Sequence, residues 1–191
     1  MKIINRIEAI HKLNNGKPLI FQTDTLPAIG CKPEYSEIIY KIKRRNKEKA
    51  LILMGSEISQ VLKYVHPAAK GDFLKTAEEF WPGALTMVVP ISEENCFNFI
   101  SKTNTIGIRV PNSLDAQLLI SRTGPLSTSS ANISGISTAI TAEEVACDLP
   151  NVDILGPIPW KKCSGLGSTI ISWSSKGSWK LIREGQVAIL K

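Results

Sequence analysis

Residues 168–190 read STIISWSSKGSWKLIREGQVAIL, and this stretch decides the fold class of the chain. Three short apolar runs within it, at 168–173, 179–184 and 187–190, have the length and composition of β-strands. The segments that separate these runs are too short to hold a helix. A purely alternating doubly wound fold needs a helix between successive strands, so the stretch excludes that fold.

The rest of the chain alternates between helical and strand-like patterns. Ser113 is a plausible helix cap, and Thr141 with Glu144 forms a capping-box pattern. We predict an α/β protein with one domain over residues 1–191, in which helices pack on a twisted mixed sheet of parallel and antiparallel strands. The periodicity predicts helices at 3–13, 35–44, 57–65, 68–81, 113–122 and 141–149, and further strands at 17–23, 50–54, 85–90, 105–111, 125–130 and 152–155.

The composition is that of a globular protein, with 43% hydrophobic and 21% charged residues. The first twenty residues interleave charges with apolar positions, and no stretch approaches a membrane span, so we expect a cytoplasmic protein without a membrane partner. The four cysteines lie far apart and lack a Cys-x-x-Cys pair, which predicts free thiols rather than disulfides or a zinc site: Cys31, Cys96, Cys147 and Cys163.

Familiar catalytic motifs are missing from the sequence. It contains neither a Gly-x-Ser-x-Gly elbow nor a phosphate-binding Gly-x4-Gly-Lys-Ser/Thr loop. Its two histidines are too few for a convincing metal cluster: His11 falls in a predicted helix and His66 at the end of another. Covalent hydrolase chemistry is therefore not indicated.

Polar residues instead gather at the ends of predicted strands and in the loops beside them. Residues 125–135 read PLSTSSANISG, and residues 41–49 read KIKRRNKEK, with six cationic residues and one glutamate. Hydroxyl and amide groups donate hydrogen bonds to phosphate or carboxylate oxygens, and arginine binds either anion through two N–H groups. Together with the net charge of +6, this pattern predicts a concave basic cavity at an edge of the sheet that binds anions.

Seven motifs resemble those of the YrdC/TsaC family, the threonylcarbamoyl-AMP synthases, in the same order and spacing. They are FQTDTLPAIGC (21–31), KIKRRNKEKALIL (41–53), FWPGALTMVV (80–89), TIGIRVPNS (105–113), STSSANISG (127–135), GSTII (167–171) and LIREGQV (181–187). The chain resembles the short form of the family, which has no second domain. The resemblance implies a nucleotidyltransferase that condenses L-threonine, bicarbonate or CO2, and ATP into L-threonylcarbamoyladenylate and pyrophosphate.

The same resemblance implies the partners and the roles of individual residues. Downstream tRNA threonylcarbamoyltransferase proteins would use the product to make threonylcarbamoyladenosine beside the anticodon, and Mg²⁺ would enter with ATP. Lys49, Arg45 and Arg109 would stabilise charge, Lys41 and Lys43 would add positive field, and no residue would act as a covalent nucleophile. The implied threonine-binding residues are Thr25, Arg109, Thr128 and Ser168, and the implied ATP-binding residues are Arg45, Lys49, Thr105, Ser130, Asn132, Thr138 and Arg183.

The chain departs from the family pattern at several positions, and two other functions remain open. The departures are Gln22, Pro27, Ala28, Asn46, Ala50 and Met54. One alternative is a non-catalytic module that binds tRNA or double-stranded RNA through its positive charge. The other is a carbamoyl-adenylate enzyme like the YrdC-like module of hydrogenase-maturation carbamoyltransferases, although those chains are longer and carry zinc-finger segments.

Overall fold

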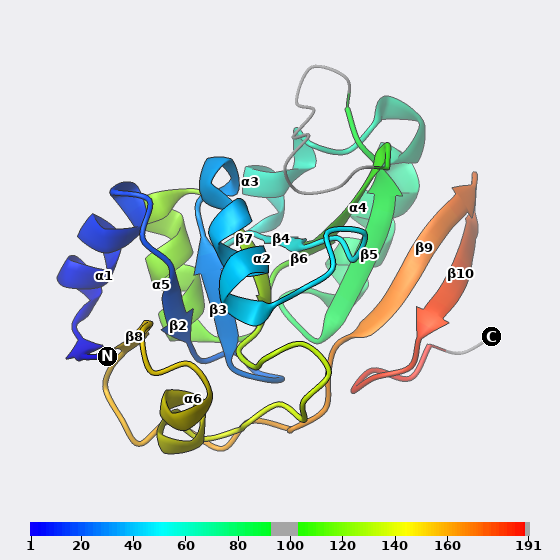
Figure 1. Cartoon of the computed structure of the whole chain (residues 1–191). Helices are drawn as coiled ribbons and strands as arrows, with labels where there is room; N and C mark the ends of the chain where they lie inside the picture. Colours follow the sequence, from blue (N-terminus) through cyan, green and yellow to red (C-terminus); the bar gives the residue numbers. More distant parts are fainter. Residues whose placement is uncertain (93–102, 190–191) are drawn as a thin grey trace.

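The structure is a computed structural model that describes residues 1–92 and 103–189 (Figure 1). Ten strands of this part of the chain form one sheet in the order β1-β8-β2-β3-β7-β4-β6-β5-β9-β10. It contains both parallel pairs, such as β4–β6, and antiparallel pairs, such as β5–β6, which confirms the predicted mixed sheet. The strands are β1 (Ile3–Ile4), β2 (Leu19–Phe21), β3 (Ala28–Cys31), β4 (Ile52–Met54), β5 (Leu85–Pro90), β6 (Thr105–Arg109), β7 (Leu126–Ser130), β8 (Asp153–Leu155), β9 (Thr169–Ser175) and β10 (Ser178–Arg183).

Helices cover both faces of the sheet. Helices α2, α3, α4 and α6 contribute side chains to a larger hydrophobic cluster, whereas α1 and α5 contribute to a smaller one. In β2, Ile20 packs in the larger cluster while Leu19 and Phe21 pack in the smaller, as alternating side chains of a strand require. The helices are α1 (Arg6–Asn14), α2 (Glu37–Lys43), α3 (Ile58–Leu62), α4 (Lys70–Phe80), α5 (Leu114–Thr123) and α6 (Ala142–Asp148), with 3-10 turns η1 (Pro33–Tyr35) and η2 (Pro67–Ala69).

The predicted helix caps are confirmed. The Ser113 side chain accepts a hydrogen bond from the backbone N–H of Ala116 at the start of α5. Thr141 and Glu144 form a reciprocal capping box at the start of α6, and Asn5 with Glu8 forms a second box that delays the start of α1 to Arg6. The two residues before that box form strand β1 rather than the predicted first turn of the helix.

The prediction of a strand at 187–190 is wrong for the three of its residues that the structure describes. Residues 187–189 lie outside any strand because other partners take the backbone groups of this segment. The Thr169 hydroxyl group accepts a hydrogen bond from the Val187 N–H at 3.1 Å, and the Gly167 carbonyl accepts one from the Gln186 N–H at 3.0 Å. Strand β3 was not predicted because Pro27 and Gly30 interrupt its pattern, yet it pairs with both β2 and β7.

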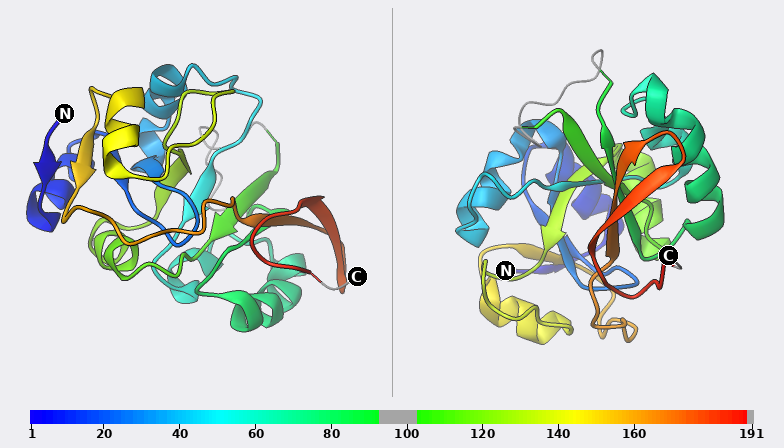
Figure 2. Two further views of the ribbon diagram at one scale, coloured as in Figure 1. Left: turned by 90° about the horizontal axis from the view of Figure 1, so that it is seen from below. Right: turned by 90° about the vertical axis from the view of Figure 1, so that its right-hand side faces the viewer.

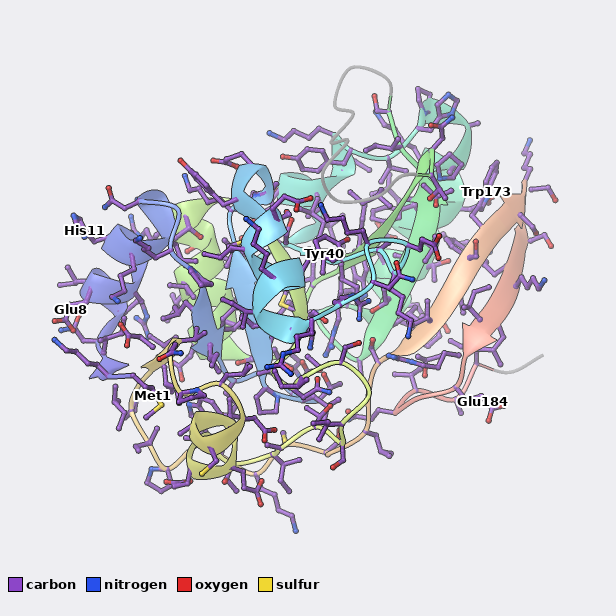
Figure 3. All side chains as sticks on the ribbon, in the orientation of Figure 1. Met1, Glu8, His11, Tyr40, Trp173 and Glu184 are labelled. Atoms are coloured by element: carbon purple, nitrogen blue, oxygen red, sulfur yellow. The ribbon has the colours of Figure 1, made fainter. Side chains whose placement is uncertain are left out.

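The C-terminal hairpin of β9 and β10 forms one end of the sheet and curves away from its centre (Figure 2). Strand β9 pairs in parallel with β5, and Asp72 of α4 accepts hydrogen bonds from the Trp173 indole at 2.8 Å and from the Gly177 N–H at 2.7 Å. Figure 3 shows Trp173 and Glu184 toward opposite ends of the hairpin. The hairpin is thereby attached at both the sheet and α4.

The described cysteines Cys31, Cys147 and Cys163 are free thiols, while Cys96 lies outside the described residues. Burial raises the pKa of the Cys31 thiol to about 12, so this thiol is un-ionised at neutral pH. Within residues 1–92 and 103–189, no helix has the length and hydrophobicity needed to span a bilayer.

Candidate active site

A cavity of about 590 Å³ opens on one face of the sheet. Helices α1 and α5 pack on another part of the same face. Ala28 and Met54 belong to the smaller hydrophobic cluster and also line this cavity, so the cavity begins where that cluster ends. The cavity brings together nine of the eleven residues that the resemblance assigned to threonine or ATP: Thr25, Arg45, Thr105, Arg109, Thr128, Ser130, Thr138, Ser168 and Arg183. The other two, Lys49 and Asn132, are not among its lining residues.

Strand register orders the lining residues into rows across the cavity floor. At one end, Met54 of β4 lies beside Arg109 of β6. In the middle, Gly107 lies between Ile52 of β4 and Val88 of β5. Thr105 occupies the other end, and because a strand rises about 3.3 Å per residue, each row is roughly 7 Å from the next.

Arg109 is the most enclosed charge of the site, with 4% of its surface exposed. Its Nη2 donates to Asp24 Oδ1 at 2.6 Å, its Nη1 donates to Thr25 Oγ1 at 2.7 Å, and its Nε donates to the Gly83 carbonyl at 3.0 Å. Burial lowers the pKa of Arg109, and the Asp24 carboxylate opposes that change. Because each Nη atom carries two N–H groups, these contacts leave one N–H on each for a ligand.

Ser168, directly before β9, and Arg183, the last residue of β10, flank the same end of the cavity. The Ser168 hydroxyl group lies 2.8 Å from the Thr86 hydroxyl group, and Arg183 Nη2 donates to the Ser168 carbonyl at 2.7 Å. Partial burial lowers the pKa of Arg183. The positive charge of Arg183 also acts on Arg109, so two arginines converge beside the Thr86 and Ser168 hydroxyl groups.

Asn132 shapes the loop after β7. Its Nδ2 donates to the carbonyls of Ile133 and Ile136 at 2.9 and 2.6 Å, and its Oδ1 accepts from the Ser130 hydroxyl group at 2.6 Å. Lys43 supports the same loop, since its Nζ contacts the Ser130 carbonyl, the Asn132 carbonyl and Asn132 Oδ1. Lys43 is 1% exposed and points into this loop rather than lining the cavity.

The buried Lys43 predicts a pH effect on stability. Burial and the nearby Arg45 lower its pKa from 10.5 to about 8, so between these values the unfolded chain binds a proton that the folded chain does not. Folding is then favoured by rising pH. We expect the free energy of unfolding of the wild type to rise by about 2 kcal/mol relative to Lys43→Met between pH 8 and pH 10, as measured by urea denaturation. Equal pH dependence of the two proteins would contradict this prediction.

The basic segment after α2 contributes one side chain to the cavity. Arg44 adopts a left-handed conformation (φ 50°) that ends the helix, and Arg45 then turns back so that its Nε and Nη2 donate to the carbonyls of Lys49 and Ala50, each at 3.0 Å. The Lys49 side chain and Lys41 are exposed. A role for the Lys49 ammonium in ATP binding therefore stays a prediction.

Sequence reasoning missed several residues that line the cavity. Thr86, Val88 and Gly107 lie on the same face of β5 and β6 as Arg109, and Ile52 lies beside them on β4. Period-two alternation starting from Arg109 and Thr128 identifies this face of each strand. Glu184 also lines the cavity, together with Arg45, Arg109 and Arg183, while Asp24 offsets part of the Arg109 charge. The basic character of the cavity therefore stays a prediction.

Comparison with known families places most of the chain in one of them. The Sua5/YciO/YrdC family model, described as telomere recombination, matches residues 11–185. A protein of Bos taurus named threonylcarbamoyl-AMP synthase is 31% identical over 187 residues, which cover 93% of this chain and 66% of that protein. A protein of Pseudoalteromonas translucida (strain TAC 125) with the same name is 34% identical over 142 residues, which cover 71% of this chain and 75% of that protein.

Solved structures share the fold. P. abyssi Sua5 in complex with L-threonine is 27% identical with a TM-score of 0.86, and the match covers 97% of this chain and 58% of that chain. E. coli YciO has a TM-score of 0.79 at 21% identity, which supports the fold alone. The chain thus spans about three fifths of P. abyssi Sua5 and about two thirds of the bovine relative.

Proposed function

Because the chain belongs to the Sua5/YciO/YrdC family, we propose that it is a threonylcarbamoyl-AMP synthase. It would condense L-threonine, bicarbonate or CO2, and ATP into L-threonylcarbamoyladenylate and pyrophosphate. The observation that carries the proposal is the cavity of about 590 Å³, which unites an arginine and hydroxyl cluster at Arg109 with a second polar cluster at Thr105 and Ser130. This volume is within the usual range of small-molecule sites.

The Arg109 end of the cavity suits a small amino acid. The two free N–H groups of Arg109 can bind a carboxylate, and the hydroxyl groups of Thr25, Thr86 and Ser168 can bind its polar atoms. Asp24 holds the guanidinium in one orientation through the 2.6 Å ion pair. The crystal structure of P. abyssi Sua5 in complex with L-threonine supports threonine as the amino acid.

The opposite end suits the nucleotide. Arg45 supplies a cation and Thr105 and Ser130 supply hydroxyl groups at this end, while Thr138 adds a further hydroxyl group to the cavity lining. Apolar side chains such as Leu26 and Val88 line the space between the polar groups and can contact the base or the ribose. ATP bound here would direct its α-phosphate toward the centre of the floor.

The reaction needs no protein nucleophile. The threonine amine attacks the carbon of CO2 and loses a proton to form a carbamate, or attacks bicarbonate with loss of water to the same product. A carbamate oxygen then attacks the α-phosphorus, and the bond to pyrophosphate breaks. The protein aligns the reactants, and Arg45, Arg109 and Arg183 offset the repulsion between carbamate and triphosphate.

Magnesium fits the site as part of the ATP substrate. In the described part of the chain, no cluster of three or more His, Cys, Asp or Glu residues can hold a metal ion, and Glu184 is the lone carboxylate residue among the described lining residues. Mg²⁺ commonly binds through substrate phosphates, water and one or two carboxylates, so Glu184 is the group that can assist it. When bound, the ion would neutralise phosphate charge.

Downstream, the adenylate would serve tRNA threonylcarbamoyltransferase proteins, which transfer its threonylcarbamoyl group to the adenosine beside the anticodon. An activated mixed anhydride hydrolyses readily, so its consumption by a partner enzyme follows from its chemistry. This step, like the identity of the substrates, is part of the proposal.

Threonine-dependent pyrophosphate release tests the function. Purified protein with MgATP and bicarbonate is expected to release pyrophosphate when L-threonine is added and to do so much less with L-serine, because the serine side chain lacks the methyl group that would contact the apolar lining. Omission of bicarbonate should abolish the release. Absence of threonine-dependent release, combined with salt-sensitive tRNA binding, would favour the RNA-binding alternative instead.

A further inference from the structure

Gly107 lies in the middle of strand β6, at the centre of the cavity floor. It lines the cavity between Ile52 of β4 and Val88 of β5, and is flanked along its own strand by Thr105 and Arg109. A glycine at this position weakens the strand, because it has no side chain to pack and loses more conformational freedom on folding than other residues. Its presence therefore calls for a physical explanation.

Neither the backbone nor the packing of the protein requires glycine here. Its φ lies outside the left-handed range, and a Cβ atom would meet Ile52 Cγ1 and Thr86 Cγ2 at 3.7 Å and Val88 Cγ2 at 3.8 Å, which are ordinary contacts. By contrast, a Cβ at Gly55 would lie 2.4 Å from Val61 Cγ1. Gly55 is required by its neighbours, whereas Gly107 could hold a methyl group without displacing any protein atom.

The three atoms nearest to that added methyl group all belong to side chains that line the cavity. The methyl group would thus occupy space on the ligand side of the sheet. Small residues inside a strand often mark a place where a ligand approaches the backbone closely. The position of Gly107, roughly 7 Å along the strand from both Arg109 and Thr105, lies between the two polar ends of the cavity.

We propose that Gly107 keeps clear the part of the floor where the two substrates are joined, so that the carbamate and the α-phosphate lie directly above its Cα atom. This inference rests on the proposed function, since it places threonine at the Arg109 end and the nucleotide at the Thr105 end. Gly107 is then a specificity-determining position. A side chain here would obstruct a ligand that spans the floor from end to end, but it would not affect a ligand that binds at one end alone.

The test is the Gly107→Ala variant, compared with the wild type and with Gly71→Ala. Gly71 lies in α4, and a Cβ there would meet nothing within 4 Å, so this control adds the same methyl group away from the cavity. We expect Gly107→Ala to lower threonine-dependent pyrophosphate release at saturating substrates at least tenfold. Its Kd for L-threonine alone, measured by calorimetry, should change less than threefold.

Thermal unfolding separates this role from a structural one. Removal of glycine from a compatible position restricts the unfolded chain, so Tm of both variants should stay constant or rise by about 2 °C. Full activity of Gly107→Ala would overturn the inference. A fall in its Tm large enough to unfold part of the protein at the assay temperature would also overturn it, because unfolding would then explain the lost activity. A wild-type protein that releases no pyrophosphate with threonine would overturn the proposed function itself, and this inference with it.

Discussion

Replacement of Arg109 by alanine is expected to lower kcat/KM for threonine-dependent pyrophosphate release at least 100-fold. Arg109 is 4% exposed and lines the cavity, where the N–H groups that Thr25 and Asp24 leave unused would bind the carboxylate of threonine. Loss of a buried charged donor at a reaction site typically costs about 3 kcal/mol of transition-state stabilisation, which corresponds to roughly 100-fold in rate.

The same substitution also leaves the Asp24 carboxylate without its ion-pair partner. The Asp24 side chain is 13% exposed, and an unpaired buried charge costs about 3–5 kcal/mol of stability. Arg109→Lys keeps a cation beside Asp24 but loses the planar fork, so it should fold more stably than Arg109→Ala and still lose most of the activity. Arg122→Ala, which removes an exposed arginine at the end of α5, is the control. Wild-type kinetics in a folded Arg109→Lys protein would contradict the assigned role.

Gly185→Ala is expected to disrupt the C-terminal wall of the cavity. A Cβ at this position would lie 2.3 Å from the Gly167 carbonyl oxygen, 2.5 Å from the Ser168 carbonyl carbon and 2.5 Å from the Thr169 nitrogen. These are backbone atoms, so no side-chain rotation relieves the overlap and one of the two chain segments must move. The movement would displace Ser168 and the hydrogen bond that it accepts from Arg183.

The expected result is a loss of stability by about 1–3 kcal/mol and of activity by more than tenfold. For a chain of this length the stability change corresponds to a fall in Tm of roughly 2–10 °C, measurable by circular dichroism. Gly71→Ala again provides the matched control, since its added methyl group meets no atom within 4 Å. If Gly185→Ala kept both the Tm and the rate of the wild type, the two segments would not be in the close contact described.

Much of the fold was predictable from local patterns. The apolar and β-branched runs at 85–90 and 105–111 became β5 and β6, because a buried strand is typically built from such residues. Ser113 and Thr141 marked the starts of α5 and α6, because a side chain that accepts from a free N–H group is a local requirement of a helix start. The strand predicted at 187–190 failed because the N–H and the carbonyl of Val187 both bind the Thr169 hydroxyl group, which no local window contains.

The candidate site was predictable as a set of residue types but not as an arrangement. The resemblance named Thr25, Arg109 and Ser168 together, and the tertiary structure shows how they meet: Arg109 reaches Thr25 across 84 positions of sequence, and Ser168 pairs with Thr86 across 82. The two lysines predicted to add positive electrostatic potential differ in their environment. Lys41 is exposed, whereas Lys43 is buried against Ser130 and Asn132. Burial of a lysine depends on packing from distant segments, which the sequence pattern does not reveal.

The sequence by itself determined the class of the fold, the family and the residue types of the cavity, because hydrophobic periodicity, caps and motif spacing are properties of short segments. Tertiary structure alone decided the strand order, the two free N–H groups on Arg109 and the open floor at Gly107. Those features come from contacts between segments far apart in the chain. The free energy of such a contact depends on which strands pair and which faces of the sheet are covered. Only the folded sheet brings the interacting groups within reach of one another.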